Sequence, residues 1–166
     1  SLLLSEVRND GSVALGNFWV RRARRLLPAL FLVLTATSVL ALLFAPGEAA
    51  ELRGDVLSAL FYVTNWDFVF SDKSYFEIMG RPPLLQHLWS LAVEEQFYLF
   101  WPLIFIGGMR WLGKRRFAWA IAAAALVSAA WMALLFDEGS DPSRVYYGTD
   151  TRASALLIGC ALAFWW

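Results

Sequence analysis

The stretch LLPALFLVLTATSVLALLF (residues 26–44) contains 19 consecutive residues without a charged side chain. A helix of about 20 such residues is long enough to cross the roughly 30 Å hydrocarbon core of a bilayer. Pro46 and Gly47 follow this stretch and predict the end of the helix. Segment 117–136 has the same character, with Ser128 as its only strongly polar residue. These two segments predict helices that span a membrane.

Three weaker segments extend this pattern, and the full set of candidate spans is 26–45, 52–70, 84–106, 117–136 and 153–166. The intervening stretches at 1–17, 72–83 and 137–150 are predicted to be loops. No segment shows the alternation of apolar and polar residues that is typical of strands. Because a backbone in lipid must satisfy its own hydrogen bonds, helices are the expected solution. The sequence therefore predicts an all-α, polytopic integral membrane helical bundle.

Composition supports the membrane class and excludes several others. Hydrophobic residues make up 59% of the chain, above the ~45–50% usual for soluble domains, and the mean hydropathy is +0.53. The net charge is zero, so no basic field indicates a nucleic-acid partner. A single cysteine, Cys160, excludes an internal disulfide, and with one histidine it gives no zinc-type ligand set.

Charged residues are concentrated in clusters between the apolar segments. Arginines and lysines gather at 21–25 and at 110–116, and such clusters favour the cytoplasmic side of a membrane. Three candidate spans separate the two clusters, and three complete crossings would place them on opposite sides. We therefore expect the most polar of these spans, 52–70, to be a re-entrant or interfacial segment.

The stretch 86–102 places the only histidine and two carboxylates inside an aromatic, apolar segment. On a helix, at about 100° per residue, the side chains of this polar stripe lie close to one line; they are His87, Ser90, Glu94 and Tyr98. Ionisable groups inside a membrane usually face a cavity and have a function, so we expect Glu94 to turn toward neighbouring helices. The alternative is a polar network that only ties helices together. Glu95 falls to one flank of the stripe, whereas Trp89 and Gln96 point to the opposite side.

Two further groups of charged residues allow a functional and a purely structural interpretation. Arg22 and Arg25 share a helix face and could clamp the phosphates of a coenzyme A thioester, because guanidinium binds phosphate bidentately. The alternative role is a topological anchor before the span. Near the other end, Asp150 could cap a helix and Arg152 could be an interfacial anchor.

Three segments together resemble known family motifs. HLWSLAVEEQFYL (residues 87–99) is similar to the best-known motif of the membrane-bound acyltransferase 3 family, whose members O-acylate sugars and other cell-envelope molecules. FWVRRARRLLPAL (18–30) resembles the Arg-x-x-Arg segment of that family, and YYGTDTRA (146–153), followed by LLIG (156–159), resembles its Thr-Asp-x-Arg segment. The three matches occur in the family's order and span nearly the whole chain.

The resemblance implies a function, a location and roles for particular residues. The implied reaction moves an acyl group, often acetyl, from an acyl-CoA donor to a hydroxyl of an envelope carbohydrate or lipid-linked glycan. No permanently bound cofactor or metal is expected, and the location would be the bacterial inner membrane, crossed several times. Arg22 and Arg25 match the pair associated with donor handling, and Arg152 becomes a candidate for the active-site lining, with Asp150 as its candidate partner. The candidate catalytic residues are therefore Glu94, His87, Ser90, Tyr98 and Arg152.

The chain departs from the family pattern in one respect. The proposed catalytic histidine of the family lies in an Arg/Lys-x10-His pattern on the first membrane helix, and residues 1–166 contain no such pattern. We therefore expect a fragment holding part of the acyltransferase 3 domain, with its base upstream and no activity of its own. Two alternatives from other classes stay open: a transporter or channel segment whose polar stripe lines a permeation path, and a non-catalytic membrane scaffold.

Overall fold

The computed structural model describes residues 14–70, 83–139 and 141–165, and every regular element within these ranges is helical. The elements are α2 (Leu15–Phe44), the short 3-10 helix η1 (Pro46–Glu48), α3 (Ala49–Leu60), α4 (Thr64–Phe70), α5 (Leu88–Trp111), α6 (Gly113–Leu135), α7 (Ser143–Tyr147) and α8 (Thr149–Trp165). The all-α prediction is therefore confirmed. The predicted loops at 1–17 and 72–83 lie almost entirely outside the described residues, except that α2 already begins at Leu15.

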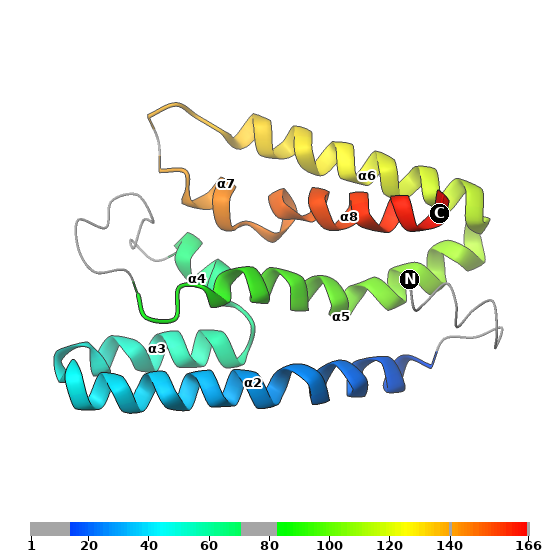
Figure 1. Ribbon diagram of the computed structural model, residues 1–166. Coiled ribbons are helices and arrows are strands. Elements are labelled where there is room, and N and C mark those ends of the chain that lie inside the picture. Colours follow the sequence, from blue (N-terminus) through cyan, green and yellow to red (C-terminus); the bar gives the residue numbers. More distant parts are fainter. Residues whose placement is uncertain (1–13, 71–82, 140, 166) are drawn as a thin grey trace.

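The helices form three layers (Figure 1). α2 and α3 make an antiparallel pair on one side, α6 and α8 make a second antiparallel pair on the other, and α5 runs between them. The larger apolar core lies where α5, α6 and α8 meet; its buried residues are Trp101, Phe105, Phe117, Ala118, Ile121, Ala161 and Phe164. A second core joins α2 and α3 to the start of α5 and contains Leu30, Leu34, Ala41, Leu52, Ala59 and Leu85.

Within the described ranges, two helices, α2 and α6, are long and apolar enough to cross a membrane by length and composition. With 30 and 23 residues, they extend about 45 and 35 Å at ~1.5 Å per residue. Most of their apolar windows face outward, with only 17% and 22% buried inside the bundle, as expected for lipid-facing helices. α5 has 24 residues and covers most of the predicted span 84–106, but it begins only at Leu88.

The predicted span 52–70 is not one helix. α3 has 12 residues and α4 has 7, which give about 18 and 10 Å, so neither can cross the bilayer alone. The first turns of α2 and the joint between α5 and α6, which carry the two basic clusters, lie at the same end of the bundle (Figure 1). The expectation that 52–70 does not cross completely stays a prediction.

The predicted acidic loop at 137–150 is partly wrong. It contains the short helix α7, and α8 starts at Thr149, four residues before the predicted span at 153. Pro142 precedes α7, where its fixed φ suits the entry to a helix, and Asp141 accepts hydrogen bonds from the N–H and hydroxyl of Ser143 at 3.1 and 2.8 Å.

Gly108 is required where α5 meets α6. A Cβ atom at this position would collide with the ring of Phe117, which is buried in the larger core. We expect Gly108→Ala to lower the free energy of unfolding by about 1–3 kcal/mol, the usual effect of overpacking. The matched control is Gly107→Ala, because a Cβ there meets no other atom within 4 Å. Thermal unfolding in detergent should separate the two variants, and equal melting temperatures would contradict this account of the joint.

Candidate active site

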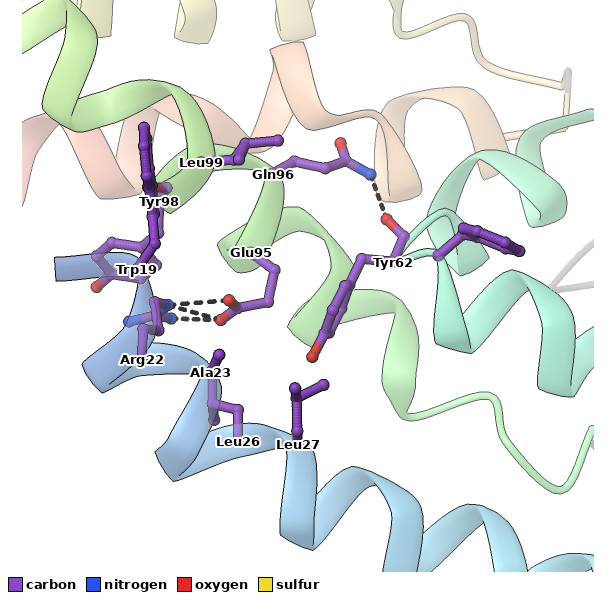
Figure 2. Close-up of a pocket in the computed structure, with 11 residues that line it drawn as sticks. Trp19, Arg22, Ala23, Leu26, Leu27, Tyr62, Glu95, Gln96, Tyr98 and Leu99 are labelled. Atoms are coloured by element: carbon purple, nitrogen blue, oxygen red, sulfur yellow. Dashed lines mark hydrogen bonds and ion pairs between the residues drawn. The ribbon is translucent and has the colours of Figure 1, made fainter. Parts of the chain in front are cut away.

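Arg22, in the basic cluster on α2, is held by an ion pair and a cation–π contact. Its Nε donates to both carboxylate oxygens of Glu95 on α5 at 2.9 Å, and its Nη2 also donates to Oε1 (Figure 2). The guanidinium carbon lies 3.4 Å from the ring centroid of Tyr98, in a cation–π contact. The side chains of the ion pair are only 23% and 13% exposed. A charge in this position is oriented by three contacts and screened little by solvent.

Trp19 extends this cluster by one turn of α2. Its indole N–H donates to the backbone carbonyl of Tyr98 at 3.4 Å. Because Trp19 and Arg22 are three residues apart, they occupy the same helix face. The two side chains therefore hold α2 against α5 at the level of Tyr98.

Two clefts meet at Arg22 and Tyr98. The first, which we call the α3–α4 cleft, has a volume of about 340 Å³ and lies between α2, the turn after α3 and α5. The second, the α8 cleft, has a volume of about 510 Å³ and lies between α2, α5 and α8. Arg22 and Tyr98 line both clefts, whereas Arg25 lines only the α8 cleft. The other residues that line the α8 cleft are mostly apolar. The α8 cleft therefore has two arginines on one side and apolar side chains on the others.

The predicted polar stripe is divided by the structure. His87, Ser90 and Glu94 are exposed, and Ser90 uses its hydroxyl to bind the carbonyl of His87 at 3.2 Å. Glu94 makes no hydrogen bond or ion pair with the residues that the structure describes, so the expectation that it turns toward these helices is wrong. Of the four stripe residues, only Tyr98 turns toward α2 and lines the clefts.

Gln96, which the sequence analysis placed opposite the stripe, is the centre of a buried polar network. Its Nε2 donates to the carbonyl of Tyr62 at 2.7 Å and to Oδ1 of Asn65 at 2.9 Å. Its Oε1 accepts from the hydroxyl of Thr149 at 2.6 Å and from the indole of Trp66 at 3.3 Å. This one side chain therefore connects α5 to the turn after α3, to α4 and to the start of α8.

Asn65 completes the network. It is fully buried, and its Nδ2 donates to the carbonyl of Tyr147 at 3.0 Å and to the hydroxyl of Thr149 at 2.9 Å. Each donor and acceptor of this amide therefore has a partner, as buried polar groups require. The Thr149 of the third motif is fixed by this network rather than exposed to either cleft.

The expected pairing of Asp150 with Arg152 is wrong. Asp150 instead accepts two hydrogen bonds from Arg144 at 2.9 and 2.7 Å and one from the indole of Trp131 at 2.9 Å. The hydrogen bond from Arg144 is the main reason why the pKa of Asp150 lies below its usual range. Side chains two residues apart on a helix point in different directions, which explains why Asp150 finds its partner on the preceding helix.

Arg152 lies with a different set of aromatic residues. Its Nε donates to the carbonyl of Tyr146 at 2.7 Å, and its guanidinium lies 4.6 and 5.7 Å from the ring centroids of Tyr146 and Trp89. It lines neither cleft at Arg22. The predicted catalytic residues are thus not gathered into one site, because only Tyr98 joins the Arg22 pair.

Among the described residues, no three histidine, cysteine, aspartate or glutamate side chains come together in a way that could hold a metal ion. The site at Arg22 offers fixed guanidinium groups, a carboxylate and phenols. Such groups bind anions and orient carbonyl or hydroxyl oxygens.

Comparison with known proteins identifies the family. The model of an acyltransferase domain matches residues 3–166, so the chain belongs to this acyltransferase family. A putative peptidoglycan O-acetyltransferase of Bacillus subtilis, YrhL, is 50% identical over the whole chain, which covers 26% of that protein. The peptidoglycan O-acetyltransferase OatA of Listeria monocytogenes is 46% identical, with 27% covered. A putative O-acetyltransferase of Staphylococcus aureus is 40% identical, with 28% covered.

The chain therefore spans about a quarter of the length of these curated relatives. No solved structure gives a significant match.

Proposed function

We propose that this protein is an integral membrane O-acyltransferase of the cell envelope. It moves an acyl group, in the simplest case acetyl, from an acyl-CoA donor to a hydroxyl of an envelope carbohydrate or lipid-linked glycan. The family and the names of the relatives support the reaction class, and the apolar helices α2 and α6 support the membrane location. The observation that carries the proposal is the fixed guanidinium of Arg22, which stands between two clefts.

The two arginines of the Arg-x-x-Arg segment have different roles in this proposal. Arg25 is exposed and lines the α8 cleft, so its planar fork is available for the phosphates of the donor. Arg22 is neutralised by Glu95, which makes it a weaker attractor of phosphates but a well-oriented hydrogen-bond donor. Preorganised donors of this kind stabilise charge that develops in a transition state.

The chemistry needs no group beyond donor and acceptor to balance. The acceptor hydroxyl oxygen attacks the thioester carbonyl carbon, and the carbonyl oxygen takes up negative charge in the tetrahedral intermediate. Collapse of this intermediate breaks the C–S bond, and the hydroxyl proton ends on the departing thiol. Arg22 is placed to stabilise the oxyanion while the apolar walls of the clefts exclude water.

We further propose that the protein lies in the bacterial plasma membrane and crosses it several times, with both basic clusters on the cytoplasmic side. The clusters lie at one end of the bundle (Figure 1), in agreement with the preference of arginine and lysine for that side. A hydrophilic acyl-CoA could then reach Arg25 from the cytoplasm without crossing lipid.

The test of this proposal is Arg25→Lys in the complete gene product. Lysine keeps the charge but loses the bidentate fork, so we expect the KM for acyl-CoA to rise about tenfold, equivalent to the ~1.4 kcal/mol of one weakened contact. Membrane insertion should be unchanged, because lysine satisfies the positive-inside preference equally well. Initial rates of acyl transfer, normalised to the amount of protein in the membrane, give the result.

The matched control is Arg24→Lys. Arg24 belongs to the same cluster and is exposed, but it lines neither cleft at Arg22. We expect a wild-type KM from this variant. A wild-type KM in Arg25→Lys as well would mean that Arg25 does not bind the donor and acts only as a topological anchor.

A further inference from the structure

Tyr62 has a backbone conformation that does not suit a tyrosine. It is the only non-glycine residue in the described part of the chain with a positive φ, at 53°. Its N–H donates to the carbonyl of Ala59 at 3.1 Å, and the N–H of Val63 donates to the carbonyl of Ser58 at 2.8 Å. These two bonds define a Schellman motif at the end of α3, in which glycine normally takes the position of Tyr62. An aromatic residue in this place is strained.

The surrounding structure holds Tyr62 in this conformation. Its carbonyl accepts a hydrogen bond of 2.7 Å from Gln96, whose amide is fixed in turn by Asn65 and Thr149. Strained residues that are held in this way are concentrated at functional sites. The end of α3 alone does not explain why a tyrosine occupies this position, because glycine would end the helix without strain.

The side chain of Tyr62 offers that explanation. It lines the α3–α4 cleft together with Arg22 and Glu95, and Figure 2 shows its ring extending from the turn toward α2, on the Glu95 side of the ion pair. The phenol hydroxyl makes no hydrogen bond with the described residues, so it is available to a ligand. Glycine at this position would leave the cleft without that hydroxyl.

We propose that Tyr62 is a further catalytic residue, whose phenol donates a hydrogen bond to the carbonyl oxygen of the acyl donor. This inference rests on the proposed function. As the acceptor oxygen attacks, the carbonyl electron pair moves to its oxygen, and the hydrogen bond from the phenol stabilises the resulting oxyanion. The phenol keeps its proton throughout. The C–S bond then breaks, and the acceptor proton ends on the thiol.

Two variants of Tyr62 in the complete gene product separate catalysis from folding. Tyr62→Phe removes only the hydroxyl, and we expect kcat to fall by roughly 100-fold, as for the loss of one oxyanion donor, with an unchanged KM for acyl-CoA. Tyr62→Gly removes the strain together with the hydroxyl. We expect its kcat to fall at least as far, while its membrane abundance equals or exceeds that of the wild type.

The outcomes are distinct. A wild-type kcat in Tyr62→Phe overturns the inference, and so does a loss of activity in both variants that only follows their abundance. If the wild type transfers acyl groups from acyl-CoA and Arg25→Lys raises the KM as expected, failure at Tyr62 concerns this inference alone. If the wild type transfers none, the proposed function fails and the role of Tyr62 fails with it.

Discussion

Arg22→Gln should reduce acyl transfer by at least about 100-fold, because the loss of one preorganised oxyanion donor typically lowers kcat by about 100- to 1000-fold. The variant removes the guanidinium that stands between the two clefts. It also leaves Glu95, whose side chain is only 13% exposed, without its cation. Acyl transfer per unit of protein in the membrane is the measurement.

The control for this prediction is Arg24→Gln on the same helix. It removes the same charge from the same cluster, but Arg24 is exposed and lines neither cleft at Arg22. Three basic residues remain in the cluster in either variant, so the orientation in the membrane should be kept. Equal losses of activity in both variants would show that the cluster acts only through its total charge.

A double variant separates the two effects of losing Arg22. Arg22→Gln with Glu95→Gln leaves no unpaired buried charge, and replacing both partners is usually far less destabilising than removing one. We expect the membrane abundance of the double variant to exceed that of Arg22→Gln, while its acyl transfer stays low. Recovery of activity along with abundance would mean that Arg22 serves stability alone.

The helices were predictable because their signal is local. Long apolar runs without charge predicted α2 and α6, and the length of the apolar segment 84–106 predicted most of α5. The break inside 52–70 was not predictable in this way. A Schellman motif is normally recognised in a sequence by its glycine, and in this one the position is taken by Tyr62. Sequence therefore joined α3 and α4 into one candidate span.

The candidate site was predictable only in part, since it depends on contacts between distant segments. A helical wheel gives the angle between Glu94 and Glu95, but it does not say which of them faces α2. The resemblance pointed to Arg22, whereas its partner is 73 residues away in the sequence. Gln96 was missed because a neutral amide carries no charge signal, although its place opposite the stripe in an apolar helix could have indicated a buried partner.

The largest effect on stability is expected at Asn65, where Asn65→Asp should lower the free energy of unfolding by about 3–5 kcal/mol. The amide nitrogen now donates to the carbonyl of Tyr147 and to Thr149. A carboxylate has no donor, so both bonds are lost and an acceptor oxygen faces the Tyr147 carbonyl. The position is fully buried, and an uncompensated charge there also loses its hydration.

The matched control for this substitution is Asn17→Asp. Asn17 is exposed in the first turn of α2, where a negative charge interacts favourably with the helix dipole. We expect its melting temperature in detergent to equal that of the wild type, while Asn65→Asp unfolds earlier and accumulates less in the membrane. Because Asn65 fixes Gln96, and Gln96 holds the carbonyl of Tyr62, the Asn65→Asp molecules that do fold should also turn over more slowly. A wild-type melting temperature in Asn65→Asp would mean that the network contributes little to the fold, and the link from Thr149 to the cleft would then have no energetic basis.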